Sequence, residues 1–220
     1  VRPGDSVDLI AQDELDHGTA LVRCNPILLI DSDEMEPRGS LKKRLGVPKE
    51  ALLCYVQLGA GKINDIDSEI NMVLEALSKH KNVYAVVGES MLGERVTSEY
   101  DRVRILRDYP NSRYFDDFDF AVMAGGYNSF HEAIQASLPT ICLPNMKTGR
   151  DDQLARTIVA EGAGCMVVIR ERNRNTIQAA IDRIVETDVR EMMGNNFQLL
   201  KRKNGAKQIA DWIISQAQLD

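Results

Sequence analysis

The sequence lacks an excess of basic charge. Its 220 residues contain 27 Lys and Arg against 33 Asp and Glu, which gives a formal net charge of -6 and a pI near 5.2. A general nucleic-acid binder needs a basic face that neutralises phosphates, and only scattered pairs such as Lys42-Lys43 are present. We therefore expect no nucleic-acid partner, and an anionic ligand would have to be held by local groups.

Cysteines with metal-ligand or redox spacing are also lacking. Cys24, Cys54, Cys142 and Cys165 lie far apart, and three of them stand inside apolar runs such as "LLCYV" and "TICLP". This pattern favours buried, reduced thiols and a cytoplasmic protein. No apolar run approaches the ~20 residues of a membrane span, and no secretory signal opens the chain. We expect no stable membrane span.

The first fifty residues lack the regular pattern of the rest. They contain a short apolar run at 26–30, a loop-like "DSDEMEPRGS" and a small helix around "SLKKRLG", with Gly46 as its C-cap. We interpret residues 1–50 as a linker and irregular N-terminal segment with a poorly ordered start. The first residue is Val and not Met, so we expect a piece of a longer protein.

Apolar runs alternate with helical spacing from residue 51 onward. The strands predicted from near-continuous apolar runs are "LLCYVQLG", "VYAVVG", "VRIL", "FAVMAG", "TICLP" and "CMVVI". Between the strands, apolar residues recur at helical spacing from Ile66 onward and predict a helix there. Further helices are predicted from Ser129 to about Ser137 and from Asp152 to about Glu161. Strands without polar alternation are buried on both faces. Residues 51–220 are therefore predicted to form an α/β, Rossmann-like parallel sheet with helices on both faces.

The tail from Thr176 onward is predicted to form two C-terminal helices. The last of them contains Trp212, Ile213 and Ile214, which we expect on an inward face. The predicted domain at 51–220 includes these C-terminal helices.

Three loops should meet at one edge of such a sheet, because ligands of open parallel sheets bind beyond the carboxyl ends of the strands. The first loop is Gly59-Ala60-Gly61, which follows a strand and precedes a helix. A backbone can come close to a phosphate or sugar there. The dinucleotide-binding match is weak, since Asn64 stands where a third glycine belongs, and a plain tight turn remains an alternative.

The second loop, Gly125-Gly126, precedes a helix that begins near Asn128 and Ser129. Backbone N–H groups and the positive end of the helix dipole would point outward there, an arrangement that fits a pyrophosphate. The alternative is structural: Ser129 and Glu132 have the S-x-x-E spacing of a capping box.

The third loop ends in Asp152-Gln153 at another helix start. Acidic residues in that position usually cap helices. A carboxylate beside an amide also suits sugar hydroxyls, because one accepts hydrogen bonds and the other both donates and accepts.

Together these residues resemble the donor-binding signature of GT-B-type nucleotide-sugar glycosyltransferases, the group of the bacterial muramyl-lipid N-acetylglucosaminyltransferase and the UDP-glycosyltransferases. The likeness runs from about Leu52 to Val185 and lies in the joint spacing of one set of residues: Gly126-Tyr127-Asn128-Ser129, Glu132-Ala133, Pro139, Pro144 and Asp152-Gln153. The resemblance implies the C-terminal, donor-binding half of a GT-B fold.

The resemblance also implies roles for single residues. Asn128 and Ser129 would contact the pyrophosphate, Glu132 the ribose, and Asp152 with Gln153 the donor sugar. The loop 59–61 would face the cleft between two domains, and the backbone of residues 106–108 would contact the base.

One position departs from the pattern of the family. Many plant members carry a phosphate-binding His where Ala124 stands here. Lys62, Lys147 or Arg150 could supply the missing positive charge.

The function expected from the resemblance is binding of a UDP-sugar for transfer of its hexose to an acceptor hydroxyl. No cofactor is expected. No metal is expected either, because the helix dipole and loop amides would stabilise the charge on the leaving pyrophosphate. In agreement, "DIDSE" at residues 65–69 reads as a helix start rather than as a metal motif. The partners would be the donor and a missing N-terminal acceptor domain, which usually supplies the general base. His17, His80 and His131 read as surface or packing residues. A nucleotide-sugar 2-epimerase and a non-catalytic nucleotide-sugar-binding subunit remain alternatives.

Overall fold

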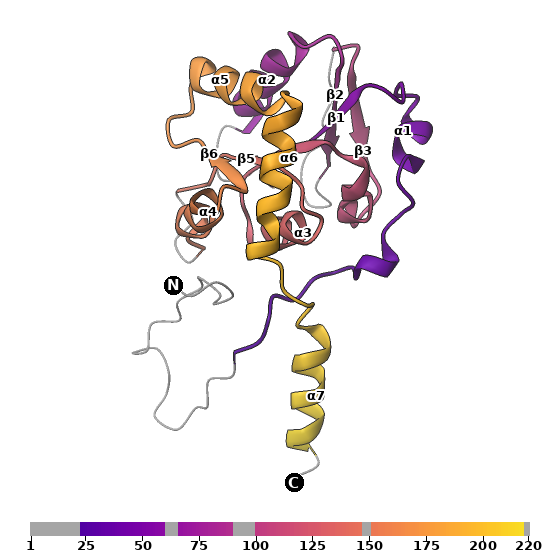
Figure 1. Ribbon diagram of the computed structural model, residues 1–220, viewed down its shortest axis with the longest axis vertical. Helices are drawn as coiled ribbons and strands as arrows, with labels where there is room; N and C mark the ends of the chain where they lie inside the picture. The colour runs from indigo at the N-terminus through magenta and orange to yellow at the C-terminus, as the bar shows by residue number, and fades with distance from the viewer. Residues whose placement is uncertain (1–22, 60–65, 90–99, 147–150, 218–220) are drawn as a thin grey trace.

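A computed structural model describes residues 23–59, 66–89, 100–146 and 151–217. Within them one parallel sheet has the strand order β3-β2-β1-β4-β5-β6 (Figure 1). Its strands are β1 (Leu52–Gln57), β2 (Val83–Gly88), β3 (Val103–Leu106), β4 (Phe120–Met123), β5 (Thr140–Cys142) and β6 (Met166–Val168). This order is the one of doubly wound dinucleotide-binding folds. The predicted Rossmann-like fold is confirmed.

The burial of the middle strands on both faces explains why their sequences are continuous apolar runs. β1 and β4 lie side by side with Cys54 opposite Phe120 and Val56 opposite Val122, and all four side chains are fully buried. Because helices cover both faces of the sheet, neither face of these strands contacts water, and no polar alternation appears in their sequence.

Helices cover the sheet from two sides. On one face α2 (Ile66–Ser78) and α5 (Arg174–Ile184) pack together, with Val73 and Ile181 in a shared core. On the other face lie α3 (Tyr127–Gln135), α4 (Gln153–Gly162) and the 3-10 helix η3 (Asn111–Asp117). Met193 of α6 (Thr187–Asn196) joins the first core, and Phe197, in the 3-10 turn η4 (Phe197–Leu199) after it, joins the second.

Part of the predicted linker packs against the domain. The short helix α1 (Ser40–Leu45) ends at Gly46, whose φ of +65° confirms the predicted C-cap. Leu41 is fully buried in the core, and its N–H donates to Asp117 Oδ2 at 2.6 Å. The short 3-10 turn η2 (Ser32–Glu34) precedes α1, and residues 26–30 form no strand. Residues 1–22 lie outside the described range.

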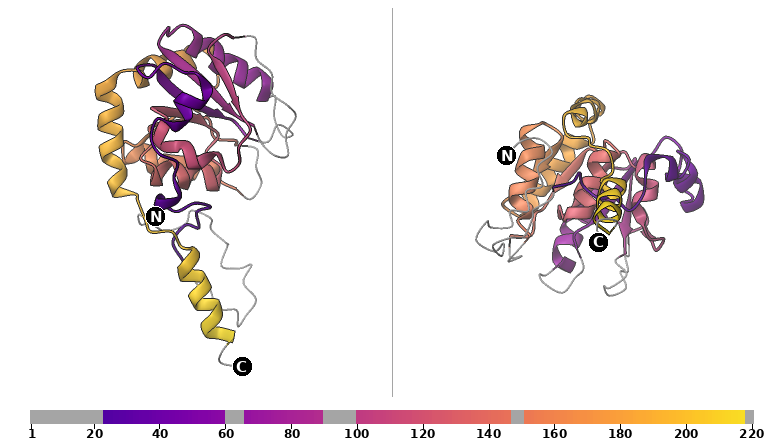
Figure 2. Two further views of the ribbon diagram at one scale, coloured as in Figure 1. Left: turned by 90° about the vertical axis from the view of Figure 1, so that its right-hand side faces the viewer. Right: turned by 90° about the horizontal axis from the view of Figure 1, so that it is seen from below.

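The C-terminal helices differ from the prediction. In the part of the chain that the structure describes, three α-helices follow β6 instead of two, and the last, α7 (Ala206–Ala217), has no buried residue. Its Trp212, Ile213 and Ile214 are 39%, 55% and 55% exposed, so the expected inward face is wrong. Figure 1 and the left view of Figure 2 show α7 projecting away from the sheet.

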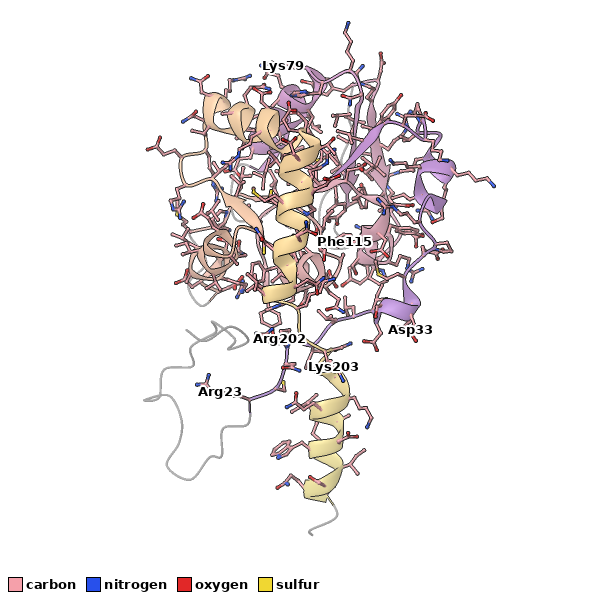
Figure 3. All side chains as sticks on the ribbon, viewed as in Figure 1. Arg23, Asp33, Lys79, Phe115, Arg202 and Lys203 are labelled. Atoms are coloured by element: carbon pink, nitrogen blue, oxygen red, sulfur yellow. The ribbon has the colours of Figure 1, made fainter. Side chains whose placement is uncertain are left out.

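Arg202 and Lys203 lie where α7 leaves the body of the domain, far from Phe115 in the core (Figure 3). The nearby apolar segment is tied to this junction, because Gly205 N–H donates to Pro26 O at 2.8 Å and Leu28 N–H to Asn204 Oδ1 at 3.0 Å. Of the described helices, none has the length and apolar character that crossing a bilayer would require.

Candidate functional site at the carboxyl edge of the sheet

The carboxyl ends of β1, β4 and β5 bring three predicted loops to the same edge. Ala124 N–H, just after β4, donates to Gln57 O at the end of β1 (3.1 Å). Asn145 N–H, after β5, donates to Gln153 Oε1 at 2.9 Å. Gly59, Asn128-Ser129 and Asp152-Gln153 therefore share one edge. Ala60, Gly61, Lys62, Lys147 and Arg150 lie outside the described residues, so the predictions on them stay predictions.

Two glycines at this edge have backbones that only glycine adopts readily. Gly59 has φ +108° and Gly125 has φ +83°, and side chains are strained in this left-handed region. A Cβ on Gly125 would also lie 2.7 Å from Thr157 Cγ2. The loop after β4 is thus packed tightly onto α4.

The start of α3 carries no side-chain cap. The helix begins at Tyr127 with Gly126 as N-cap, and no side-chain cap is found there among the described residues. Ser129 is therefore inside the first turn, where its Oγ lies 3.5 Å from Gln57 Oε1, and the capping-box alternative is wrong. The first N–H groups of a helix have no partner within it, and they coincide with the positive end of its dipole. This start can receive an anion.

Glu132 lies one turn further along α3. Its Oε1 is buried and has no hydrogen-bond partner within the described part of the chain, and the same holds for the Ser112 hydroxyl of η3. Burial raises the pKa of the Glu132 carboxyl, and the nearby Ser112 hydroxyl offsets part of that rise, although their geometry falls short of a hydrogen bond. Glu132 can accept hydrogen bonds from a ligand.

A buried polar chain that the sequence did not predict lies below this helix start. Tyr55 donates its hydroxyl to Gln57 Oε1 at 3.1 Å, and Asn111 Nδ2 donates to the Tyr55 hydroxyl at 3.2 Å. Burial raises the pKa of Tyr55 far above its usual value, so the phenol stays neutral and fixes Gln57 beside Ser129. Tyr55 stands in the apolar run "LLCYV", which predicts a strand and gives no sign of a polar role for this residue.

At the third loop, Asp152 caps α4. Its Oδ1 accepts from Ala155 N–H at 2.9 Å, and the side chain is exposed. Gln153 is only 8% exposed. Its amide bonds to Asn145 N–H and, through Nε2, to Asp151 Oδ2 at 3.0 Å. Asp152 therefore faces solvent with one oxygen in the cap, whereas Gln153 is held inside the loop.

Arg156 is the functional-site residue that sequence reasoning missed. It is 1% exposed, and it bonds to Gly125 O at 3.1 Å and to Asp151 Oδ1 at 2.5 Å. The signal was its spacing, because Gln153, Arg156, Thr157 and Ala160 follow the i, i+3, i+4, i+7 pattern of a buried face.

The segment 106–108, expected near a base, is partly engaged by the protein itself. The Leu106 carbonyl accepts from Glu89 N–H at 3.1 Å. Tyr114 and then Arg44 hold the pKa of the Asp108 carboxyl below its usual range, because both donate hydrogen bonds to it. The contact with a base stays a prediction.

His131 packs against aromatic rings, with its ring 4.6 Å from Tyr127 and 5.1 Å from Phe130. Cys54, Cys142 and Cys165 are free and buried, as the apolar runs predict. Among the residues that the structure describes, His, Cys, Asp and Glu side chains form no group of three that could hold a metal ion.

Comparison with known proteins decides the fold. No family model matches the chain. A curated relative, an uncharacterized glycosyltransferase of Methanopyrus kandleri, is 23% identical over 180 residues, which are 78% of this chain and 49% of the relative. The solved glycotransferase of kitacinnamycin has a TM-score of 0.64 at 18% identity, over 88% of this chain and 49% of its own. The chain has the fold of the GT-B glycosyltransferases.

Other GT-B structures match in the same way. An O. sativa protein solved in complex with U2F and trichothecene has a TM-score of 0.62 at 16% identity, over 83% of this chain and 46% of its own. A spinosyn rhamnosyltransferase complexed with thymidine diphosphate has a TM-score of 0.58 at 16% identity, over 70% of this chain and 42% of its own. The resemblance stated from the sequence is confirmed, and the chain spans about half the length of these proteins.

Proposed function

We propose that this chain binds the nucleoside diphosphate part of a nucleotide sugar, with a UDP-sugar as the expected donor, for transfer of a hexose to an acceptor hydroxyl. The observation that carries the proposal is the start of α3. It follows a left-handed Gly125, carries no side-chain cap and lies at the carboxyl edge of the sheet. Such a start attracts phosphates through backbone N–H groups and the helix dipole.

The chemistry of the donor agrees with this placement. When an acceptor hydroxyl attacks the anomeric carbon, the bond from that carbon to the phosphate oxygen breaks and the nucleoside diphosphate leaves with the electron pair. N–H groups aimed at the departing pyrophosphate stabilise its growing negative charge. Glu132 would bind the ribose hydroxyls through its buried, unpartnered Oε1, and the exposed Asp152 would bind the sugar.

The comparisons support the ligand class. One structural relative is a complex with thymidine diphosphate, which is a nucleoside diphosphate of the kind proposed. Because the chain spans about half the length of such proteins, we propose that the acceptor-binding site and the general base belong to a second, N-terminal domain. Transfer by this chain alone should then be undetectable.

Calorimetry with UDP, TDP and GDP tests the binding half of the proposal, and a UDP-release assay with several sugar donors tests the other half. We expect saturable UDP binding of modest affinity, since the site is open on one side, and at most slow donor hydrolysis. Absence of binding to every nucleoside diphosphate, with the fold intact, would contradict the proposal. Sugar transfer by the isolated chain would show that it contains the base.

A further inference from the structure

Arg156 is the largest of the fully buried side chains described, at 1% exposure. A guanidinium carries its charge at all relevant pH values, and burial of that charge is costly unless the group is paired and hydrogen-bonded. It stands in the first turn of α4, directly behind the loops of the proposed donor site. A protein that needed only packing there would use an apolar residue.

The guanidinium joins two loops that come from different strands. Nη1 donates to the carbonyl oxygen of Gly125, after β4, at 3.1 Å. Nη2 donates to Asp151 Oδ1, in the loop after β5, at 2.5 Å. Its central carbon also lies 5.3 Å from the centre of the Tyr127 ring, within the range of a cation–π contact.

The network extends beyond Arg156. The second oxygen of Asp151 accepts from Gln153 Nε2 at 3.0 Å, and Gln153 Oε1 accepts from Asn145 N–H at 2.9 Å. A continuous line of hydrogen bonds therefore runs from Asn145 to Gly125. It ties the loop that precedes α4 to the loop that precedes α3.

The bond to Gly125 fixes the direction of a peptide unit. The carbonyl of Gly125 and the N–H of Gly126 belong to one planar trans peptide, so they point in opposite directions. Since Arg156 holds the carbonyl toward the interior, the N–H of Gly126 is directed away from it. Two successive glycines would otherwise let this peptide rotate at little steric cost.

We propose that Arg156 is a positioning residue for the nucleotide-sugar donor, which locks the Gly125-Gly126 peptide so that the start of α3 presents its N–H groups to the pyrophosphate. This inference rests on the proposed function. Arg156 acts through Gly125 and Asp151, and it links the phosphate-binding loop to the loop that carries Asp152.

The test compares Arg156→Met and Arg156→Lys with a control at the opposite edge of the sheet. Arg190 is half-buried and also donates to backbone carbonyls, those of Ile184 and Val185. It lines a cavity with Asp119 and Pro139, which precede β4 and β5. Arg190→Met therefore removes a comparable set of bonds far from the site.

Calorimetry with UDP gives the first readout. Arg156→Met should weaken UDP binding by roughly tenfold or more, because the Gly126 N–H would lose its hydrogen bond to the charged pyrophosphate. Arg156→Lys should lie between it and the wild type, because an ammonium cannot reproduce the two-pronged geometry. Arg190→Met should keep the wild-type affinity. Unchanged UDP affinity in Arg156→Met would overturn the proposal, and if that variant does not fold, unchanged affinity in Arg156→Lys would do so.

Nuclear magnetic resonance of the ligand-free, nitrogen-15-labelled protein gives the second readout. The Gly126 amide should show exchange broadening in Arg156→Met, or in Arg156→Lys if Met does not fold, and none in Arg190→Met. A purely structural arginine would lower the melting temperature without this local effect, and a sharp Gly126 signal would contradict the proposal. If the wild type binds no nucleoside diphosphate, the proposed function fails, and the Gly126 signal alone then decides whether Arg156 positions this peptide.

Discussion

Glu132 shows how burial and chemistry combine at a single residue. Its position three residues after Ser129 matches a capping box, yet α3 begins at Tyr127 and Glu132 bonds to no helix end. A buried carboxylate oxygen without a protein partner costs stability. That cost is understandable if the oxygen accepts hydrogen bonds from ribose hydroxyls when the donor binds.

Replacement of this carboxylate separates the two roles. Glu132→Gln should weaken UDP binding by about 1.5–3 kcal/mol, the range for a hydrogen bond to a charged group. The melting temperature at neutral pH should not fall, because no cap is lost. Calorimetry and thermal unfolding measure the two effects. A large loss of stability with unchanged UDP affinity would favour a structural role.

The same variant should change how stability depends on pH. Burial raises the pKa of Glu132 above its ordinary value of 4.5, so the folded chain binds this proton more tightly than the unfolded chain. The free energy of unfolding should therefore decrease as the pH rises from about 4.5 through the folded pKa. Glu132→Gln should lack this decrease, which urea unfolding over that range would detect. A wild type that gains stability relative to the variant as pH rises would contradict the assignment.

Asp152 is predicted to serve the sugar and is seen to cap α4. Asp152→Ala should weaken binding of a UDP-sugar more than binding of UDP, because only the former places hydroxyls near the carboxylate. It should also cost about 0.5–2 kcal/mol of stability through the lost cap. Asp152→Asn keeps a capping oxygen and controls for stability. Equal calorimetric losses for both ligands would show that Asp152 acts through loop structure.

At the scale of elements, strands were predictable and helix environments were not. β1 and β4 are buried on both faces, and short continuous apolar runs of this kind predict such strands. The start of α3 was misplaced because Gly126, which has no side chain to signal a cap, takes the N-cap position. Arg156 was missed because a charged residue on a helix reads as solvent-facing until its partners Gly125 and Asp151 are known.

The environment of helix α7 was likewise not predictable from the sequence. Apolar residues at helical spacing predict that a face will be covered but do not say by what, and Trp212, Ile213 and Ile214 contact no core here. Removal of residues 206–220 should therefore shift the melting temperature by no more than about 2–4 °C, equivalent to roughly 1 kcal/mol. Thermal unfolding checks this.

A substitution in the core shows how large the loss of stability would be if α7 belonged to the core. Phe197 is fully buried, and Phe197→Ala should cost about 3–5 kcal/mol. If the truncation destabilised the domain as much as this variant does, α7 would belong to the core after all.

For the whole molecule, topology determines where the site lies. All five strand pairings among the described residues are parallel. The loops after β1, β4 and β5 therefore had to meet at one edge once the sheet was predicted. The identity of the acceptor could not be predicted from this sequence, because we expect a second domain to recognise it. We therefore confine the proposal to the donor, with the start of α3 as the proposed binding site of its nucleoside diphosphate.

Titration of nitrogen-15-labelled protein with UDP, monitored through the backbone amide signals, would show directly whether a nucleoside diphosphate binds at the start of α3. We predict saturable shifts that are largest for the amides of Gly126, Asn128 and Ser129, with smaller shifts around Glu132 and little change near Arg190 at the opposite edge. No shifts at millimolar UDP, or shifts concentrated at the opposite edge while Gly126 to Ser129 stay unchanged, would contradict it.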